Sequence, residues 1–504
     1  MGLVGGEDGG VETVLVLGDQ LDRGRGPLAR ARAGRSRVLF VESGATIRLP
    51  GWHRQRLHLV LAGMRRLAGE LEAEGVEVDY RPAPSVPAGV AAHVREYQPA
   101  QVVAAAPSSF DGRRSLTALG VRLERSEAFL CHEDDFAAFA AGRARFRMED
   151  FYRWQRRRLG YLMDGDAPAG GRWNFDGENR AGPPRDARAW PKALRQPLDD
   201  LDREVLAGLP EGSFGAAPDG LWPTSRAEAL RRLEHVVAEV LPTFGPFQDA
   251  MLAEQPFLAH SLLSPALNVG LLHPKEVAEA IEVAWRGGRV PIASAEGLLR
   301  QVIGWREYVW GRYWQWMPAY RDRNELVATR PLPPVFRGGQ TAMRCVGEVL
   351  RSVAARGYAH HIQRLMVLGN LGLLAGIEPL EMARWMQRGF VDGAEWVMLP
   401  NVLGMALFAD GGAMATKPYA AGGSYLNRMS DYCKGCRFDP RRRTGPDACP
   451  FTTLYWDFLD RHAERLARNP RVARQVAACR RLGDLGEVRR RAGAVLDALD
   501  AGAL

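Results

Sequence analysis

Cysteine is scarce in this chain, and several other common features are absent from it. The 504 residues include only six cysteines, too few for a small fold stapled by disulfide bonds. No window approaches the run of about 18 apolar residues that a membrane-spanning helix requires, and we find no repeat period. The first apolar run, at residues 11–20, is short and lacks a basic leader, so we expect no signal peptide. These absences favour a cytoplasmic globular protein with no membrane partner. In the cytoplasm, paired cysteines bind metal more often than they form disulfides.

The net charge of the chain is positive. The formal charge is +8 at pH 7, and such an excess favours polyanionic partners, nucleic acid first. A GC-rich genome also enriches arginine through its codons. Charge alone therefore leaves nucleic-acid binding open.

The first 135 residues alternate between strand and helix patterns. Short apolar runs predict strands at residues 13–21, 37–43, 76–82 and 101–107. Residues 53–75 carry apolar side chains at helical spacing. This alternation is typical of a Rossmann-like parallel sheet with helices on both faces. Because ligands bind at the carboxyl ends of such strands, residues 18–20 and 42–45 are candidate binding loops, with plain turns as the alternative.

The rest of the chain has a different character. Residues 164–225 are rich in glycine, proline and charge, which is typical of a long connector, and helical periodicity dominates from residue 226 onward. We expect a disordered tail at 1–10, an α/β domain at 11–140, a helix and interdomain linker at 141–225, and a large all-α domain at 226–504.

Four cysteines suggest a metal site. Cys433 and Cys436 are separated by two residues, Cys449 follows twelve residues later, and Cys345 lies far upstream in a helical segment. Four thiolates suit a tetrahedral zinc ion or a [4Fe–4S] cluster. The spacing leaves zinc, iron–sulfur and no metal open.

Basic residues surround these cysteines. They would offset thiolate charge or meet nucleic-acid phosphate, and they are Arg437, Arg441, Arg442 and Arg443. The two remaining cysteines, Cys131 and Cys479, lie in apolar contexts and are predicted to be inert core thiols.

Tryptophan is abundant in the helical half. The chain has 13 tryptophans, and Trp310 and Trp314 are four residues apart, so they would share one helix face. Core packing is the simpler interpretation. The alternative is a cofactor pocket or an electron-hopping chain, because indole is easily oxidised.

Residues 356–371 contain two adjacent histidines. On a helix, His361 would share a face with Tyr358, and His360 and Arg364 would lie on the adjoining face. Histidine titrates near neutral pH and is the natural proton donor. A structural role is the alternative.

Two serines precede a proline in residues 260–272. Backbone N–H groups and the hydroxyls of Ser261 and Ser264 at a helix start suit phosphate. A plain helix cap is the alternative.

Taken in order, these motifs resemble the cryptochrome/photolyase superfamily, and most closely its bacterial iron–sulfur branch. LVLGDQL resembles the family's opening strand and loop, and SLLSPALNVGLL its flavin-phosphate segment. GWREYVWGRYW, GQTAMRCV and GYAHHIQRLMVLGNL resemble its helical signatures. The stretch from EWVMLPN to YCKGC resembles the iron–sulfur branch specifically. The resemblance covers nearly the whole chain and implies a photolyase-like architecture.

The resemblance implies three cofactors. These are FAD in the all-α domain, 6,7-dimethyl-8-ribityllumazine as an antenna in the α/β domain, and a [4Fe–4S] cluster. The implied cluster ligands are Cys345, Cys433, Cys436 and Cys449. The implied FAD contacts are Ser261, Leu263, Ser264, Trp305, Arg364, Asp392, Met398, Asn401 and Asp410. Glu42 and His53 lie in the loop that would face the antenna.

The implied reaction is light-driven repair of pyrimidine (6-4) photoproducts in UV-damaged DNA. Excited reduced flavin would give one electron to the lesion, a histidine would protonate it, and the electron would return. His361 matches the lesion-facing histidine, with His360 beside it, and Tyr419 and Tyr425 match aromatic residues near the lesion. Arg364 and Asp392 match an ion pair close to the flavin ring, with a structural salt bridge as the alternative.

Three positions depart from the family's pattern: Met386, Met398 and Arg337. Met398 stands where relatives have an acid or amide near the flavin, and a thioether makes no strong hydrogen bond. Met386 follows Trp385, the implied first electron donor, and Arg337 stands where a tryptophan is expected. Photoreduction would then be slower or rerouted, for example through Trp396 or Tyr358.

The connector offers two carboxylates, Asp176 and Glu178, that would hold Mg²⁺ against DNA phosphate. A solvated loop is the alternative. The sequence as a whole predicts a monomeric (6-4) photolyase. The alternatives are a cryptochrome-like photoreceptor with little or no repair and a nucleic-acid-binding module with structural zinc.

Overall fold

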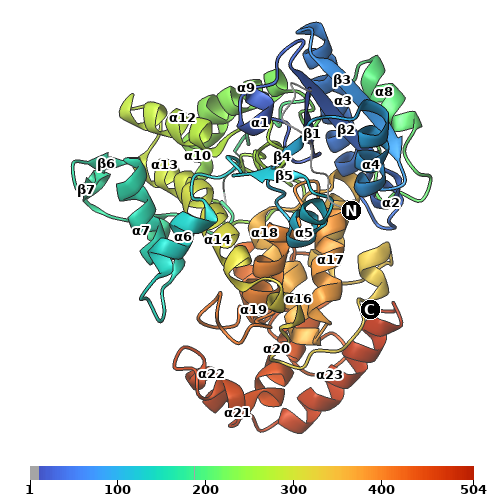
Figure 1. The fold of residues 1–504 in the computed structure, drawn as a ribbon. Coiled ribbons are helices and arrows are strands. Elements are labelled where there is room, and N and C mark those ends of the chain that lie inside the picture. The colour runs from blue at the N-terminus through green and yellow to red at the C-terminus, as the bar shows by residue number, and fades with distance from the viewer. Residues whose placement is uncertain (1–10, 185, 187) are drawn as a thin grey trace.

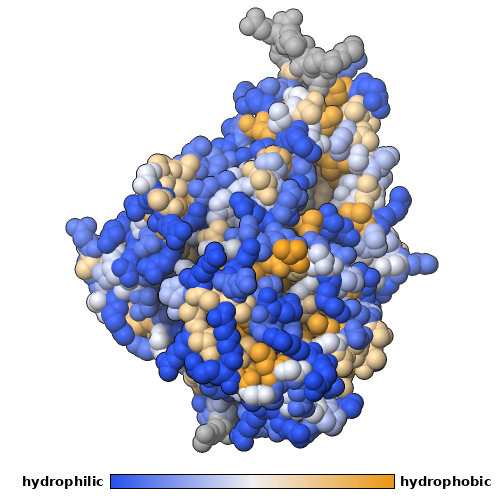
Figure 2. Space-filling model, turned by 90° about the horizontal axis from the view of Figure 1, so that it is seen from below, coloured by the Kyte–Doolittle hydropathy of each residue, from blue (hydrophilic) through white to orange (hydrophobic). Residues whose placement is uncertain are grey.

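The computed structural model describes residues 11–184, 186 and 188–504. The tail expected at residues 1–10 lies outside the described residues. No described helix is both long and apolar enough to span a membrane. Polar groups dominate the face seen in Figure 2, with apolar residues gathered in small patches.

A five-stranded parallel sheet occupies one end of the molecule (Figure 1). The strand order is β3-β2-β1-β4-β5, with Val14 opposite Val38 on one side and Val103 on the other. The strands are β1 (Glu12–Val16), β2 (Ser36–Ser43), β3 (Glu77–Ala83), β4 (Val102–Ala105) and β5 (Arg122–Glu124). The predicted parallel sheet is confirmed, and β5 is a short strand that the apolar pattern did not predict.

Helices cover both faces of this sheet. α3 (Arg54–Ala73) packs on the face that carries Val14, and α4 (Val86–Tyr97) with α5 (Phe110–Ala118) packs on the face that carries Leu15. Because both faces are buried, β1 and β2 show continuous apolar runs and not an alternating pattern.

Helices form nearly all of the remaining molecule (Figure 1). The shorter elements of the first half are α1 (Gly26–Ala29), α2 (Gly44–Ile47), α6 (Glu133–Ala140), α7 (Met148–Leu159), β6 (Met163–Asp164), β7 (Ala167–Pro168), η1 (Ala169–Gly171), η2 (Asp176–Glu178) and α8 (Asp200–Ala207). The helical body then runs through α9 (Arg226–His235), η3 (Val236–Val240), α10 (Leu241–Phe244), α11 (Ser264–Val269), α12 (Pro274–Arg286), α13 (Ile292–Leu299), η4 (Arg300–Arg306), α14 (Glu307–Trp316), η5 (Ala319–Asp322) and η6 (Pro334–Arg337). It continues with α15 (Arg344–Arg356), η7 (Gln363–Gly369), α16 (Asn370–Ala375), α17 (Pro379–Gly389), α18 (Glu395–Leu399), η8 (Pro400–Ala406), α19 (Gly423–Met429), α20 (Pro450–Arg461), α21 (Ala463–Leu466), α22 (Ala473–Cys479) and α23 (Leu485–Asp500).

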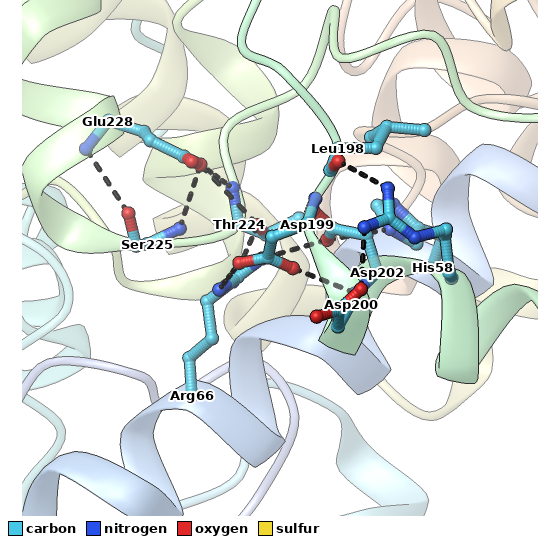
Figure 3. A network of polar contacts seen from close by, with 10 residues as sticks. His58, Arg66, Leu198, Asp199, Asp200, Asp202, Thr224, Ser225 and Glu228 are labelled. Carbon is cyan, nitrogen blue, oxygen red and sulfur yellow. Dashed lines mark hydrogen bonds and ion pairs between the residues drawn. The ribbon is translucent and has the colours of Figure 1, made fainter.

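The connector is fastened to the α/β region by a polar network (Figure 3). The carboxylate of Asp202 on α8 lies 3.0 Å from Nε2 of His58 and 2.9 Å from Arg66, both on α3. Arg66 also donates to Asp199 at 2.7 Å and to the hydroxyl of Thr224 at 3.0 Å. The glycine- and proline-rich composition predicted a long connector, and within it the structure has the helix α8, which packs against α3. Its charged residues supply that contact.

His53 joins the α/β region to the helical body. Its side chain is fully buried. Its Nδ1 accepts a hydrogen bond from the N–H of Gln55 at the start of α3, and its Nε2 lies 3.1 Å from the carbonyl oxygen of Ala354. Both contacts suit a neutral ring. The sequence placed His53 beside the antenna, but the structure uses it as a helix cap and an interdomain contact.

His53 should make the protein less stable in acid. Burial lowers the pKa of His53 to about 4, so the unfolded chain binds this proton more readily than the folded one. Stability should therefore fall as the pH drops from about 6.5 to about 4, at about 1.4 kcal/mol per pH unit from this residue. The free energy of unfolding, measured with urea at several pH values in this range, should depend less steeply on pH in His53→Asn than in the native protein. If the pH dependence of stability in His53→Asn equals that of the control His235→Asn, at a partly exposed histidine, the assignment is contradicted.

Candidate functional site

One large cavity, with a volume of about 1070 Å³, lies in the helical body. Three π-helical turns, η4, η7 and η8, contribute to its wall. Trp305, Arg364 and Asn401 reach the cavity from these turns, one from each. A π turn inserts an extra residue into a helix and re-aims the side chains around it, which is why such turns are frequent at functional sites.

The cavity brings together most of the residues that the sequence resemblance implied. Those that line it are Ser261, Leu263, Ser264, Trp305, His361, Arg364, Asp392, Met398, Asn401, Tyr419 and Tyr425. The first and last of them, Ser261 and Tyr425, are 164 residues apart in the chain, and only the packing of the helical body makes them neighbours.

Arg364 and Asp392 form a bidentate ion pair in the cavity wall. The two guanidinium nitrogens donate to the two carboxylate oxygens at 2.9 and 3.0 Å. The hydroxyl of Ser264 donates to the same carboxylate at 2.7 Å, and Asn268 donates to the Asp392 carbonyl at 2.9 Å. Ser264 therefore orients the ion pair, a role that the sequence did not assign to it.

Three histidines meet at one end of the cavity. The rings of His260 and His360 are stacked at 4.4 Å, and His361 lies edge-on to His260 at 5.5 Å. Burial lowers the pKa of His260 and of His360 well below the ordinary value, so both rings are neutral. His361 differs because 47% of its side chain is exposed, and its Nε2 lies 3.4 Å from a carboxylate oxygen of Asp249. His361 is thus the histidine able to exchange protons with a ligand.

The cavity has aromatic walls and basic residues. Tyr419 and Tyr425 line it, and burial raises the pKa of Tyr425 to about 12, so this phenol stays neutral. Besides Arg364, six cationic side chains line it: Arg180, Arg300, Arg306, Lys417, Arg428 and Arg471. Sequence reasoning missed His260, Asp249 and these cations, although His260 directly precedes the Ser261 motif.

Four implied residues lie outside this cavity lining. The Asp410 carboxylate accepts hydrogen bonds from Tyr320 and from the N–H groups of Gly412, Ala413 and Met414, and so shapes a loop. Glu42 lies in the α/β region and accepts hydrogen bonds from Tyr80 at 2.5 Å and Arg65 at 2.9 Å. The other two are His360, which packs behind His260, and Trp385.

The structure gathers the four cysteines of the candidate metal centre. Cys345 lies in the first turn of α15, Cys433 and Cys436 lie in the loop after α19, and Cys449 caps α20. Burial and the three neighbouring sulfurs raise the pKa of Cys345 well above its ordinary value, and burial raises that of Cys433 to about 12.

The spacing of these sulfurs bears on the kind of metal. A zinc ion bound at about 2.3 Å holds its sulfur ligands about 3.8 Å apart. Among the described residues, no three cysteine sulfurs lie within 4.8 Å of one another. The donor set therefore fits a cluster of several metal atoms better than a single ion.

The neighbouring arginines are partly committed elsewhere. Arg442 pairs with Asp447 at 2.5 Å and Arg443 pairs with Asp484 at 2.8 Å. Both therefore already have carboxylate partners. They are poorer candidates than Arg437 and Arg441 for balancing thiolate charge or binding phosphate.

Replacing Asp392 with asparagine should destabilise the protein. The side chains of Arg364 and Asp392 are 18% and 9% exposed, and removing one partner leaves a poorly solvated charge, at a cost on the order of 3–5 kcal/mol. Thermal unfolding should show the loss. The control is Asp200→Asn, which removes a fully exposed partner of Arg203. Equal melting temperatures for the two variants would contradict this account.

Comparisons with known proteins agree with this geometry. The family model described as deoxyribodipyrimidine photo-lyase-related protein matches residues 14–215. The chain is 40% identical over 506 residues to the (6-4) photolyase of Agrobacterium fabrum, covering 97% of this chain and 100% of that protein.

Two solved structures share the fold. A bacterial class III photolyase from Agrobacterium tumefaciens aligns with a TM-score of 0.58 at 16% identity over 99% of both chains. A cryptochrome from Synechocystis sp. PCC6803 aligns with a TM-score of 0.54 at 16% identity, over 79% of this chain and 82% of the other. They confirm the photolyase-like architecture, and the full-length identity to the (6-4) photolyase shows that the chain belongs to the cryptochrome/photolyase superfamily.

Proposed function

We propose that the protein is a light-driven DNA repair photolyase that acts on pyrimidine (6-4) photoproducts. One observation carries the proposal: a single cavity is lined by an exposed histidine, a bidentate ion pair and two tyrosines, with six further cationic side chains. The full-length identity to a (6-4) photolyase supports it.

The cavity fits FAD as its cofactor. Its volume of about 1070 Å³ is at the upper end of the range for cofactor sites, about 300–1,000 Å³. Ser261, Leu263, Trp305 and Asn401 would hold the cofactor, and the Arg364–Asp392 pair would contact the flavin ring. When bound and reduced, the flavin supplies on illumination the electron that the lesion needs, and takes it back at the end.

The chain's own residues bind and protonate the lesion. A flipped lesion exposes its aromatic faces and its phosphates. Tyr419 and Tyr425 provide walls for those faces, and the cations of the cavity bind the phosphates. His361 gives a proton to the oxygen that is transferred, and its Nε2 lies 3.4 Å from the Asp249 carboxylate, which holds the ring in place. The neutral rings of His260 and His360 do not compete for that proton.

We propose that Cys345, Cys433, Cys436 and Cys449 hold a [4Fe–4S] cluster. The all-thiolate donor set and the wide sulfur spacing support it. Such a cluster would tie the start of α15 to the loop before α20. The purified protein should then be brown-yellow and contain iron, sulfide and flavin, whereas a colourless protein with zinc would contradict both cofactor assignments.

The antenna and the magnesium ion are further parts of the proposal. A ribityllumazine released on denaturation would identify the antenna. Glu42 is a weak ligand for it, because its carboxylate already binds Tyr80 and Arg65. Asp176 lines the cavity but is paired with Arg180, so a bound Mg²⁺ would have to displace that arginine.

Asp176→Asn tests the magnesium site. Magnesium should strengthen DNA binding by the native protein, because a divalent ion bridges carboxylate and phosphate, and the variant should lose this dependence. DNA affinity measured with and without Mg²⁺ gives the answer. An undiminished Mg²⁺ effect in the variant would rule the site out.

Met398 supports a second candidate function. It lines the cavity at the position where the family resemblance implies a hydrogen-bonding side chain, and a thioether there would alter flavin redox chemistry without removing flavin. A cryptochrome-like photoreceptor would reduce its flavin in light but leave the lesion intact. Product analysis after illumination separates the two functions.

A further inference from the structure

The electron entry point implied by the sequence is isolated in the structure. Trp385 is absent from the cavity lining, and the cavity is instead lined by the next residue, Met386. The Trp385 ring contacts Phe336 at 5.0 Å and Phe390 at 5.8 Å, and its indole N–H donates to the Phe336 carbonyl. Phenylalanine is far harder to oxidise than indole. Among the described residues, the ring contacts of Trp385 are therefore with side chains that are poor electron donors.

A different row of tryptophans runs outward from the cavity. Trp396 lines the cavity. Its ring centroid lies 5.9 Å from that of Trp310, which lies 5.5 Å from that of Trp314. Phe129 stacks on Trp310 at 3.8 Å and contacts Trp396 at 4.9 Å. Trp310 is buried at 1% exposure, whereas Trp314 is partly exposed. The row thus connects the cavity to the surface.

We propose that Trp396, Trp310 and Trp314 form an electron-transfer chain that reduces the bound flavin in light, an inference that rests on the flavin site proposed above. Trp396 would give one electron to the excited oxidised flavin. Trp310 then reduces the oxidised Trp396, and Trp314 reduces the oxidised Trp310. A thiol in solution then gives one electron to Trp314 and loses its proton to water. Two such turns deliver two electrons to the flavin and join two thiols as a disulfide.

The surroundings of these indoles suit reversible hopping. Among the described residues, the buried indole N–H groups of Trp310 and Trp314 have no hydrogen-bond acceptor. An oxidised indole there has no nearby base for its proton, so the positive charge stays mobile. The flat stack of Phe129 on Trp310 adds polarisable surface at the middle step.

A cation regulates the outermost step. The guanidinium of Arg113 lies 3.5 Å from the centroid of the Trp314 ring. A positive charge there opposes oxidation of Trp314, and the ion pair of Arg113 with Glu133 offsets part of that field. Arg113→Gln should therefore speed photoreduction, an effect that mere packing of Trp314 would not produce.

The second alternative route, through Tyr358, is less suited. Tyr358 lines the cavity and contacts Trp222 at 5.7 Å. Oxidation of a phenol releases its proton, and burial raises the pKa of Tyr358. Trp222 is only 4% exposed, so this route ends in the core.

The test compares three tryptophan-to-phenylalanine variants of the flavin-loaded protein. Photoreduction with a thiol is followed by visible absorption, and transient absorption records the tryptophan radicals. Trp310→Phe should slow photoreduction at least about tenfold, since a barrier increase of about 1.4 kcal/mol suffices for that. Trp385→Phe should have little effect. Trp316→Phe is the matched control, because Trp316 lies on the same helix but stacks on Tyr320.

Each outcome decides the proposal. Loss of photoreduction in Trp385→Phe with a native rate in Trp310→Phe would overturn it. Should Trp310→Phe fail to fold, Trp314→Phe at the partly exposed end must shorten the lifetime of the tryptophan radical, and an unchanged lifetime would overturn it. Flavin content and the repair activity of chemically reduced protein are measured on the same variants, because neither depends on photoreduction. A native protein without flavin would refute the proposed function itself, whereas normal flavin binding with an unchanged Trp310→Phe rate refutes only the chain.

Discussion

Replacing His361 with alanine is expected to reduce repair of (6-4) photoproducts by about 10²- to 10⁴-fold, the usual contribution of a positioned proton donor. His361 is the exposed member of the three-histidine group and faces the cavity beside Asp249. Because it is half exposed, its loss should change the melting temperature and flavin spectrum little. Repair should be measured with chemically reduced protein, so that photoreduction does not limit the rate.

The control for this variant is His235→Ala. His235 is a partly exposed histidine at the end of α9; it contacts the carbonyl of Lys192 and does not line the cavity. It should repair at the native rate. His361→Ala repair within a factor of about two of native would show that the proton comes from elsewhere, since general acid catalysis is worth far more than that.

Replacing Cys345 with serine is expected to remove the iron and to destabilise or unfold the helical body. Binding energy at a structural metal site is folding energy, on the order of 10 kcal/mol for thiolate sites. The cluster would fasten the start of α15 to the loop that carries Cys433 and Cys436. Iron, sulfide and thermal stability should be measured on the same preparations.

The matched controls are Cys131→Ser and Cys479→Ser. Both cysteines are buried at 1% exposure, whereas the cysteines that neighbour Cys345 are Cys433, Cys436 and Cys449. They should keep full iron and show only a small loss of stability. A Cys345→Ser protein with native iron content would contradict the ligand assignment.

Much of the fold was predictable because its signals are local. Continuous apolar runs separated by a helical stripe predicted a parallel sheet covered on both faces, and β1, β2 and α3 fulfil that expectation. The connector was less predictable. Its composition did not predict the helix α8, because the position of α8 depends on the tertiary contacts of Asp202 and Asp199 with α3.

The site was predictable in membership but not in arrangement. Most of the residues that the sequence resemblance named line the cavity, including Arg364 and Asp392. The motifs did not predict that the Asp410 carboxylate would accept hydrogen bonds from the N–H groups of a loop. Nor did they predict that Trp385 would lie outside the cavity lining. Such outcomes depend on where helices cross and on the π turns that re-aim side chains. No local pattern in one sequence encodes those distances.

The central claim is tested most directly by illuminating the chemically reduced protein with an oligonucleotide that carries one (6-4) photoproduct. The digested product is then chromatographed, with a dark sample and a cyclobutane-dimer oligonucleotide in parallel. This account predicts two intact pyrimidines from the (6-4) substrate in the light, and no change in the dark. A lesion that persists under light, in protein whose flavin is bound and reduced, would contradict it.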